Sequence, residues 1–174
     1  MLAVSLIELN LQGSSTKVNN GGLILNREAL TIQYSRLTGG NANNGGAIYN
    51  AGVLSDTQKT VGTVAISNSI LQNNKADQGA ALYTDMPYYR ITQSVIRDNT
   101  ITTKNGSLLY TNIGFKDPTI GVNILYNGAS GLRNSTIFNN TGGYVANIRE
   151  GMVLNNVTMI RNDAGLYLQA PKWI

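Results

Sequence analysis

The 174-residue sequence predicts a single all-β domain over residues 1–174, a right-handed parallel β-helix in which six or seven coils stack as a solenoid. Three observations support this prediction. Short apolar segments recur along the chain, apolar and polar residues alternate within them, and Asn or Gly follows them. A period of two places successive side chains on opposite faces of a strand, so these segments are expected to be strands.

The repeat is clearest between residues 32–49 and residues 66–83, which align without a gap at an offset of 34. Further pairs of blocks align at offsets of 24, 25, 41 and 22 residues, and the three smallest offsets define a coil of 22–25 residues. The two larger offsets predict a loop insertion at 55–62 and a degenerate coil at 112–130. Equivalent segments run the same way around each coil, so each strand is expected to pair in parallel with its counterpart one turn away.

The composition provides a core but few charges. Apolar residues make up 42% of the chain and charged residues 13%, against about 25% in typical domains. The polar surface therefore consists mainly of amides, hydroxyl groups and glycine, with 23 Asn and 19 Gly. The net charge of +4 comes from scattered cations, whereas nucleic-acid sites gather them into a patch, so no nucleic-acid partner is expected. The absence of Cys excludes disulfides and thiol nucleophiles.

Four asparagines occupy one equivalent position after successive strand segments: Asn74, Asn99, Asn140 and Asn162. Asn tolerates the left-handed backbone conformation of a turn, and its side chain bonds to nearby backbone groups. In a stack of coils, side-chain amides at one position can also bond each other. We therefore interpret these asparagines as a structural turn ladder rather than as a binding site.

Two short motifs resemble those of a known family. Residues 45–48 read Gly-Gly-Ala-Ile, and relaxed forms of a Phe-x-x-Asn motif occur at 71–74, 96–99, 137–140 and 159–162. Both motifs are similar to those in the repeats of polymorphic outer-membrane proteins, and the resemblance covers most of the chain. It implies a secreted or surface-displayed β-helix with an extracellular or bacterial cell-surface location, and it implies an adhesive role.

The acidic residues do not form a recognisable catalytic set. Enzymes that hydrolyse polysaccharides by acid–base catalysis need two carboxylates about 5–9.5 Å apart. The nine acids include no adjacent pair, and His, the commonest general base, is absent. Asp98 and Asp163 lie near the same predicted turn, but two or more coils are expected to separate them. No catalytic residue, metal site or cofactor is therefore predicted.

Four tyrosines recur at one position of the coil: Tyr49, Tyr83, Tyr110 and Tyr167. An aliphatic residue precedes each of them, and alternation directs the tyrosines outward where these aliphatic residues point inward. One interpretation is an aromatic strip that binds sugar rings or a protein partner. The other is a stack of rings that stabilises the sheet.

These observations favour a non-catalytic, surface-exposed structural or adhesion module that binds protein or glycan partners through its flat β faces. Two alternatives stay open: a polysaccharide-acting enzyme of the lyase or hydrolase type on the same scaffold, and an accessory structural subunit of a larger assembly. An ice-binding face is less well supported, because the threonines form no continuous double column.

No apolar run is long enough to span a membrane. No capping helix is predicted at either end, so we expect the chain either to belong to a longer solenoid or to meet partners there, through end-to-end or lateral assembly.

Overall fold

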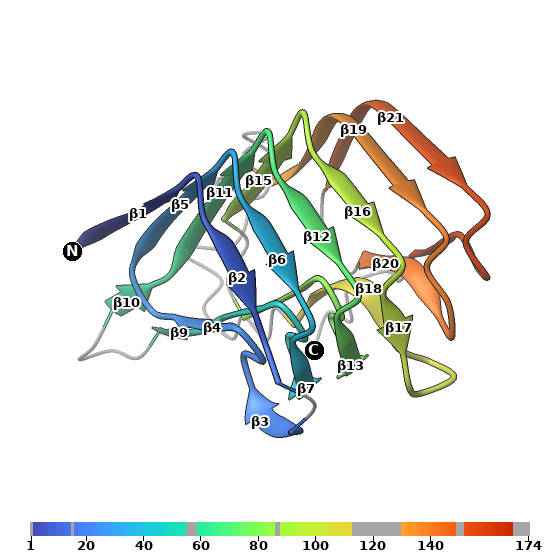
Figure 1. The fold of residues 1–174 in the computed structure, drawn as a ribbon, viewed down its shortest axis with the longest axis horizontal. Helices are drawn as coiled ribbons and strands as arrows, with labels where there is room; N and C mark the ends of the chain where they lie inside the picture. The colour runs from blue at the N-terminus through green and yellow to red at the C-terminus, as the bar shows by residue number, and fades with distance from the viewer. Residues whose placement is uncertain are drawn as a thin grey trace.

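The structure is a computed structural model that describes residues 2–14, 16–54, 59–85, 88–112, 130–148 and 152–168. The elements in these residues are all β-strands, so the described part of the chain has no helix that could cross a membrane. Figure 1 shows the strands side by side, with successive coils advancing along the longest axis of the molecule. Three sheets consist of parallel strands, which is consistent with a β-helix solenoid.

The largest sheet has ten strands in two adjoining rows. The first row consists of β1 (Ala3–Ile7), β5 (Ala29–Gln33), β11 (Thr63–Ser67), β15 (Tyr89–Thr92) and the N-terminal half of β19 (Gly131–Phe138). The second row consists of β2 (Asn10–Gln12), β6 (Arg36–Thr38), β12 (Ile70–Gln72), β16 (Val95–Arg97) and the C-terminal half of β19. The last strand of this sheet, β21 (Val153–Ile160), pairs with β19 over both rows.

The other two parallel sheets are smaller. The second sheet consists of β3 (Val18–Asn20), β7 (Asn41–Asn44), β13 (Lys75–Gln78) and β17 (Thr100–Ile101). The third sheet consists of β4 (Ile24–Asn26), β8 (Ile48–Asn50), β14 (Leu82–Thr84), β18 (Ser107–Thr111), β20 (Tyr144–Ile148) and β22 (Leu166–Leu168). In both sheets the strands follow one another in chain order, so each strand pairs with its counterpart one coil away.

Equivalent apolar residues lie above one another in the core. Ile66 on β11 is in register with Ile32 on β5 and with Ile91 on β15, and all three side chains are at most 1% exposed. The second row repeats this arrangement around Leu71, which is fully buried. The parallel stacking predicted from the repeat is therefore confirmed.

The corner between the two rows is formed by a residue with positive φ followed by a buried serine. The pairs are Tyr34 with Ser35, Asn68 with Ser69, Gln93 with Ser94, and Asn134 with Ser135. The Ser69 Oγ donates to the carbonyl of Ser67 at 2.7 Å and accepts the N–H of Ser35 at 3.1 Å. The same pair of hydrogen bonds recurs in the other coils, so this serine ladder ties each coil to the next.

The first insertion leaves the coil between β8 and β11. It contains β9 (Gly52–Leu54) and β10 (Lys59–Val61), which pair with each other in antiparallel orientation. The predicted loop at 55–62 therefore overlaps β10, and residues 55–58 lie outside the described part of the chain. The register of the sheets is unaffected, because β5 and β11 still pair directly with each other.

The second insertion lies between β18 and β19. Ile91 on β15 is in direct register with Leu132 on β19, although the two coils are offset by 41 residues. The degenerate coil predicted at 112–130 falls on this segment, and residues 113–129 lie outside the described residues. Within the described sheets, no strand comes between β15 and β19.

The stacked core predicts the cost of a cavity at Ile66. Replacing Ile66 by Ala removes atoms that pack against the coils on both sides, so we expect the free energy of unfolding to fall by about 3 kcal/mol. Urea denaturation followed by circular dichroism measures the change. Ala65→Thr, at the exposed neighbouring position of the same strand, is the control and should change it by less than about 0.5 kcal/mol. Equal effects of the two substitutions would contradict the stacked core.

Candidate functional site

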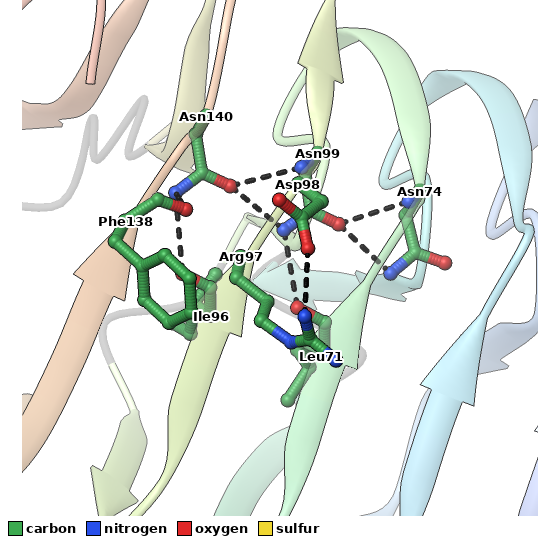
Figure 2. A network of polar contacts seen from close by, with 8 residues as sticks. All are labelled: Leu71, Asn74, Ile96, Arg97, Asp98, Asn99, Phe138 and Asn140. Carbon is green, nitrogen blue, oxygen red and sulfur yellow. Dashed lines mark hydrogen bonds and ion pairs between the residues drawn. The ribbon is translucent and has the colours of Figure 1, made fainter. Parts of the chain in front are cut away.

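The structure places the four predicted ladder asparagines in one hydrogen-bonded column. Figure 2 shows three of them, Asn74, Asn99 and Asn140. The backbone N–H and the side-chain Nδ2 of Asn74 both donate to Asn99 Oδ1, at 2.9 and 3.0 Å. Asn99 donates in the same way to Asn140 Oδ1 at 3.0 and 2.9 Å, and Asn140 to Asn162 Oδ1 at 3.1 and 2.8 Å. The Asn99 Nδ2 also donates to the carbonyl of Leu71 at 3.1 Å, so each amide ties together neighbouring coils.

The residue before each ladder asparagine turns the chain. Asn73, Asp98, Asn139 and Arg161 have φ between 52° and 55°, a left-handed conformation that lets the next side chain point inward. Asn and Asp adopt this conformation more readily than most residues. Because Asn74 and Asn99 are fully buried, their polar groups depend on the ladder for hydrogen bonds.

A second buried ladder, which the sequence analysis did not identify, runs along the end of the third sheet. Asn26 Nδ2 donates to Asn50 Oδ1 at 2.7 Å, and Asn50 Nδ2 donates to Thr84 Oγ1 at 3.0 Å. All three side chains are buried. The signal was present in the sequence, because Asn26 and Asn50 occupy equivalent positions at an offset of 24.

Three of the four predicted tyrosines form a stack on the outer side of the third sheet. The ring centroids of Tyr49 and Tyr83 are 4.8 Å apart with an interplanar angle of 9°, and those of Tyr83 and Tyr110 are 5.0 Å apart with an angle of 18°. Tyr83 is 8% exposed, and its two neighbours are half-buried. Since the rings cover one another's faces, a sugar ring cannot stack on Tyr83 while this arrangement persists.

Tyr167 occupies the same position of the coil but stands apart from this stack. Asn147 lies between Tyr110 and Tyr167 in the register of the third sheet. The ring of Tyr167 instead lies 5.1 Å from that of Tyr144, with a tilt of 36°. The four predicted tyrosines therefore do not form one continuous strip.

Tyr49 also contacts a carboxylate at the edge of the stack. Its hydroxyl donates to Asp85 Oδ2 at 2.6 Å, and Asn112 Nδ2 donates to the other carboxylate oxygen at 3.2 Å. Burial and the neighbouring Asp85 carboxylate raise the pKa of Tyr49 above its ordinary value. The Asp85 carboxylate is thus held by side chains from the coils on both sides.

Asp77 lies in a separate cluster on the second sheet. Its carboxylate accepts a hydrogen bond from Thr102 Oγ1 and forms an ion pair with Lys17 Nζ at 3.0 Å. These two contacts lower the pKa of Asp77 below its ordinary value. Both charged side chains are partly exposed, so the ion pair contributes little to stability.

The two acids that the sequence analysis compared have local partners of their own. Asp98 Oδ2 accepts a hydrogen bond from the Arg97 guanidinium at 3.0 Å (Figure 2). Asp163 Oδ2 accepts the backbone N–H of Gly142 at 2.8 Å. Across the described ranges, no three acidic side chains gather in a way that could hold a metal ion.

One outward column on the second row of the largest sheet combines aliphatic and hydroxyl side chains. Ile70 is in register with Val95, and Val95 with Thr136, and all three are half-buried. Beside this column the guanidinium carbon of Arg97 lies 5.9 Å from the ring centroid of Phe138. Aromatic and Arg side chains are enriched at protein interfaces, so this strip, termed the Val95 face, has the composition of a contact surface.

Comparisons of the chain with protein-family models, with curated proteins and with solved structures find no match. The assignment of the fold therefore depends on the register of the strands themselves. The resemblance to the repeats of polymorphic outer-membrane proteins stays a prediction.

The Asn ladder predicts a large effect for a single amide. Asn99→Ala leaves the buried Asn74 N–H and Leu71 carbonyl without these partners, so the free energy of unfolding should fall by about 3 kcal/mol. Chemical denaturation measures this change. Asn19→Ala, in an exposed Asn19–Asn43 pair, is the matched control and should cost less than about 0.5 kcal/mol. Similar costs at both positions would show that burial in the ladder is unimportant.

The raised pKa of Tyr49 predicts a loss of stability at high pH. A raised pKa means that the folded state holds the proton more tightly than the unfolded state, so this contribution is present below about pH 10 and is lost as the pH rises further. Denaturation midpoints between pH 8 and pH 11 should therefore fall less in Tyr49→Phe than in the wild type. Asp85→Asn, which removes the carboxylate that accepts the Tyr49 hydroxyl, should reduce the fall in the same direction. Superimposable profiles for the wild type and Tyr49→Phe would contradict the assignment.

Proposed function

We propose that this protein is a non-catalytic structural or adhesion module that binds partner molecules through the outward faces of its parallel sheets. One observation carries the proposal: side chains at equivalent positions of neighbouring coils contact one another. The Asn ladder, the serine ladder and the Tyr49–Tyr83–Tyr110 stack all bond along the solenoid axis. A catalytic site would instead need different functional groups converging on one point.

The Val95 face is the surface that we propose for the partner. Its Ile70, Val95 and Thr136 side chains follow one another at the spacing of adjacent strands, about 4.8 Å, and form a flat row. Arg97 and Phe138 lie beside them and supply a cation and an aromatic ring. This combination suits a protein partner better than a bare carbohydrate chain, because the aromatic ring already lies under the guanidinium group.

The finer predictions of fold and context belong to the same proposal. We propose a right-handed coil direction, which is the usual hand of connections between parallel strands. We also propose six or seven coils, supported by the offsets of 22–25 residues between three of the five pairs of repeat blocks. Membership of the class of polymorphic outer-membrane repeats is supported by Gly45 to Ile48 and by the recurring Asn at the end of the second motif. An extracellular or cell-surface location follows from that resemblance.

The proposal predicts that binding depends on one face and on none of the acids. Bacterial or host-cell extracts immobilised on a sensor surface, together with a panel of glycans, provide the candidate partners. Val95→Arg should lower binding at least about tenfold, since a charge in an apolar contact costs more than 1.4 kcal/mol. Asp77→Asn, Asp85→Asn and Asp98→Asn should each bind as the wild type does. Ala65→Arg, on the neighbouring row, is the matched control for the added charge.

The competing enzymatic interpretation makes the opposite prediction. It requires that polygalacturonate or alginate release reducing or unsaturated ends over time in the presence of the protein. It also requires that loss of a single carboxylate abolishes this release. Turnover that disappears in Asp77→Asn, Asp85→Asn or Asp98→Asn would overturn the proposed function.

A further inference from the structure

Two arginine side chains that are far apart in the sequence lie side by side on the outward side of the first row. Arg90 is on β15 and Arg133 is on β19, and both are exposed. Arg90 is in register with Gly131, and Arg133 follows Gly131 by two residues, which places it on the same side of the sheet. The Cα atoms of the two arginines are therefore diagonal neighbours about 8 Å apart. The fold thus brings together cations that are scattered in the sequence.

The positive charge of this pair is not balanced within the sheet. None of the ten strands of the largest sheet contains Asp or Glu. In the described part of the chain, neither Arg90 nor Arg133 forms an ion pair with an acidic side chain. A guanidinium group presents a planar fork of N–H donors that matches carboxylate, sulfate and phosphate groups. The two arginines can therefore bind the anionic groups of a ligand without first releasing an acidic partner among the described residues.

Small and polar side chains surround the two arginines on this side of the sheet. One outward column, in register from strand to strand, consists of Gln33, Ser67, Thr92 and Arg133. In the neighbouring column, the exposed Ala65 lies opposite Arg90. On β5, β11 and β15, no outward side chain is a hydrophobic group larger than alanine. This surface, termed the Arg90 face, therefore combines two cations with amide and hydroxyl groups.

The chemistry of the Arg90 face favours an acidic polysaccharide over the other anionic polymers. Amide and hydroxyl side chains both donate and accept hydrogen bonds, so they match the hydroxyl groups of sugars. Guanidinium groups form strong, charge-assisted hydrogen bonds with carboxylate and sulfate groups. A protein partner would need an apolar anchor, and the central strands of this face offer none. A nucleic acid would need a longer track of cations than two arginines.

We propose that the Arg90 face binds a linear acidic polysaccharide, with Arg90 and Arg133 holding its carboxylate or sulfate groups. The side chains of Ser67 and Thr92 then bind the hydroxyl groups of the same chain. This inference goes beyond the proposed function, because it adds a second ligand on a second surface. Figure 1 shows that the chain turns sharply between the first row and the second row, so the Arg90 face and the Val95 face point in different directions.

Binding of the full chain to polygalacturonate and to heparin, measured by titration calorimetry at low salt, tests the proposal. Arg90→Gln and Arg133→Gln should each weaken binding about three- to fivefold, and the double variant at least about tenfold, since each substitution removes one charge-assisted contact. Lys104→Gln removes the same charge from an exposed position between β17 and β18 and should bind like the wild type. Neutral dextran should not bind, because it has no anionic group.

A gain of binding provides a second measurement that does not depend on the glutamine variants folding. Ala65→Arg places a third guanidinium group next to Arg90, one strand spacing of about 4.8 Å away. Binding of both acidic polymers should become at least about threefold tighter and should weaken more steeply as salt is added. Ala65→Gln, which adds a long polar side chain without charge, is the matched control and should show neither change.

Three results would overturn this assignment. The first is a wild-type chain that binds neither acidic polymer, or a double variant that binds both as tightly as the wild type. The second is an equal loss of binding in Lys104→Gln, which would indicate attraction to the net charge of +4 alone. The third is tighter binding of polyglutamate or double-stranded DNA than of both polysaccharides. Val95→Arg should not weaken polysaccharide binding, so this proposal and the proposed function can fail separately.

Discussion

The hydrogen bond from one buried asparagine to the asparagine of the next coil is the interaction on which this solenoid depends. The corners of these coils are buried, so their backbone groups are out of reach of water and need partners within the protein. Asn74, Asn99 and Asn140 bond those groups from the side and are themselves bonded by the neighbouring coil. The serine ladder performs the same task at another corner. These corner residues bond groups of their own coil and of the neighbouring coil together, and stability therefore depends on neighbouring pairs of coils.

This dependence explains where the chain tolerates extra residues. A segment inserted between two sheets changes the length of one coil but not the positions at which its strands meet the coil below. The hairpin of β9 and β10 leaves the coil in this way, and Ile66 after it is still in register with Ile32 before it. An insertion within a ladder corner would displace an asparagine from its partner, and the buried amide on the other side would lose its acceptor.

The repeat made the stacking of Ile66 over Ile91 predictable, because hydrophobic alternation and a fixed offset both point to the same register. The serine ladder and the ladder from Asn26 to Thr84 were harder to recognise. Ser, Thr and Asn are abundant throughout the chain, and composition does not separate a buried polar group from an exposed one. Whether a side chain lies at a corner depends on which residue before it adopts positive φ, and here Tyr34 and Gln93 do so as well as Asn68. Tyr and Gln carry no strong signal for that conformation, so the corners became visible only in three dimensions.

The same reasoning limits where function can reside. Inward positions hold the core, and corner positions such as Asn99 hold the coils together, so neither can change without loss of stability. The ring of Tyr83 cannot stack on a ligand either, because both of its faces are covered by neighbouring rings. What stays free among the described residues are outward columns of the sheets, such as Ile70, Val95 and Thr136. A solenoid of this kind can therefore change its outward side chains without disturbing the ladders that join its coils.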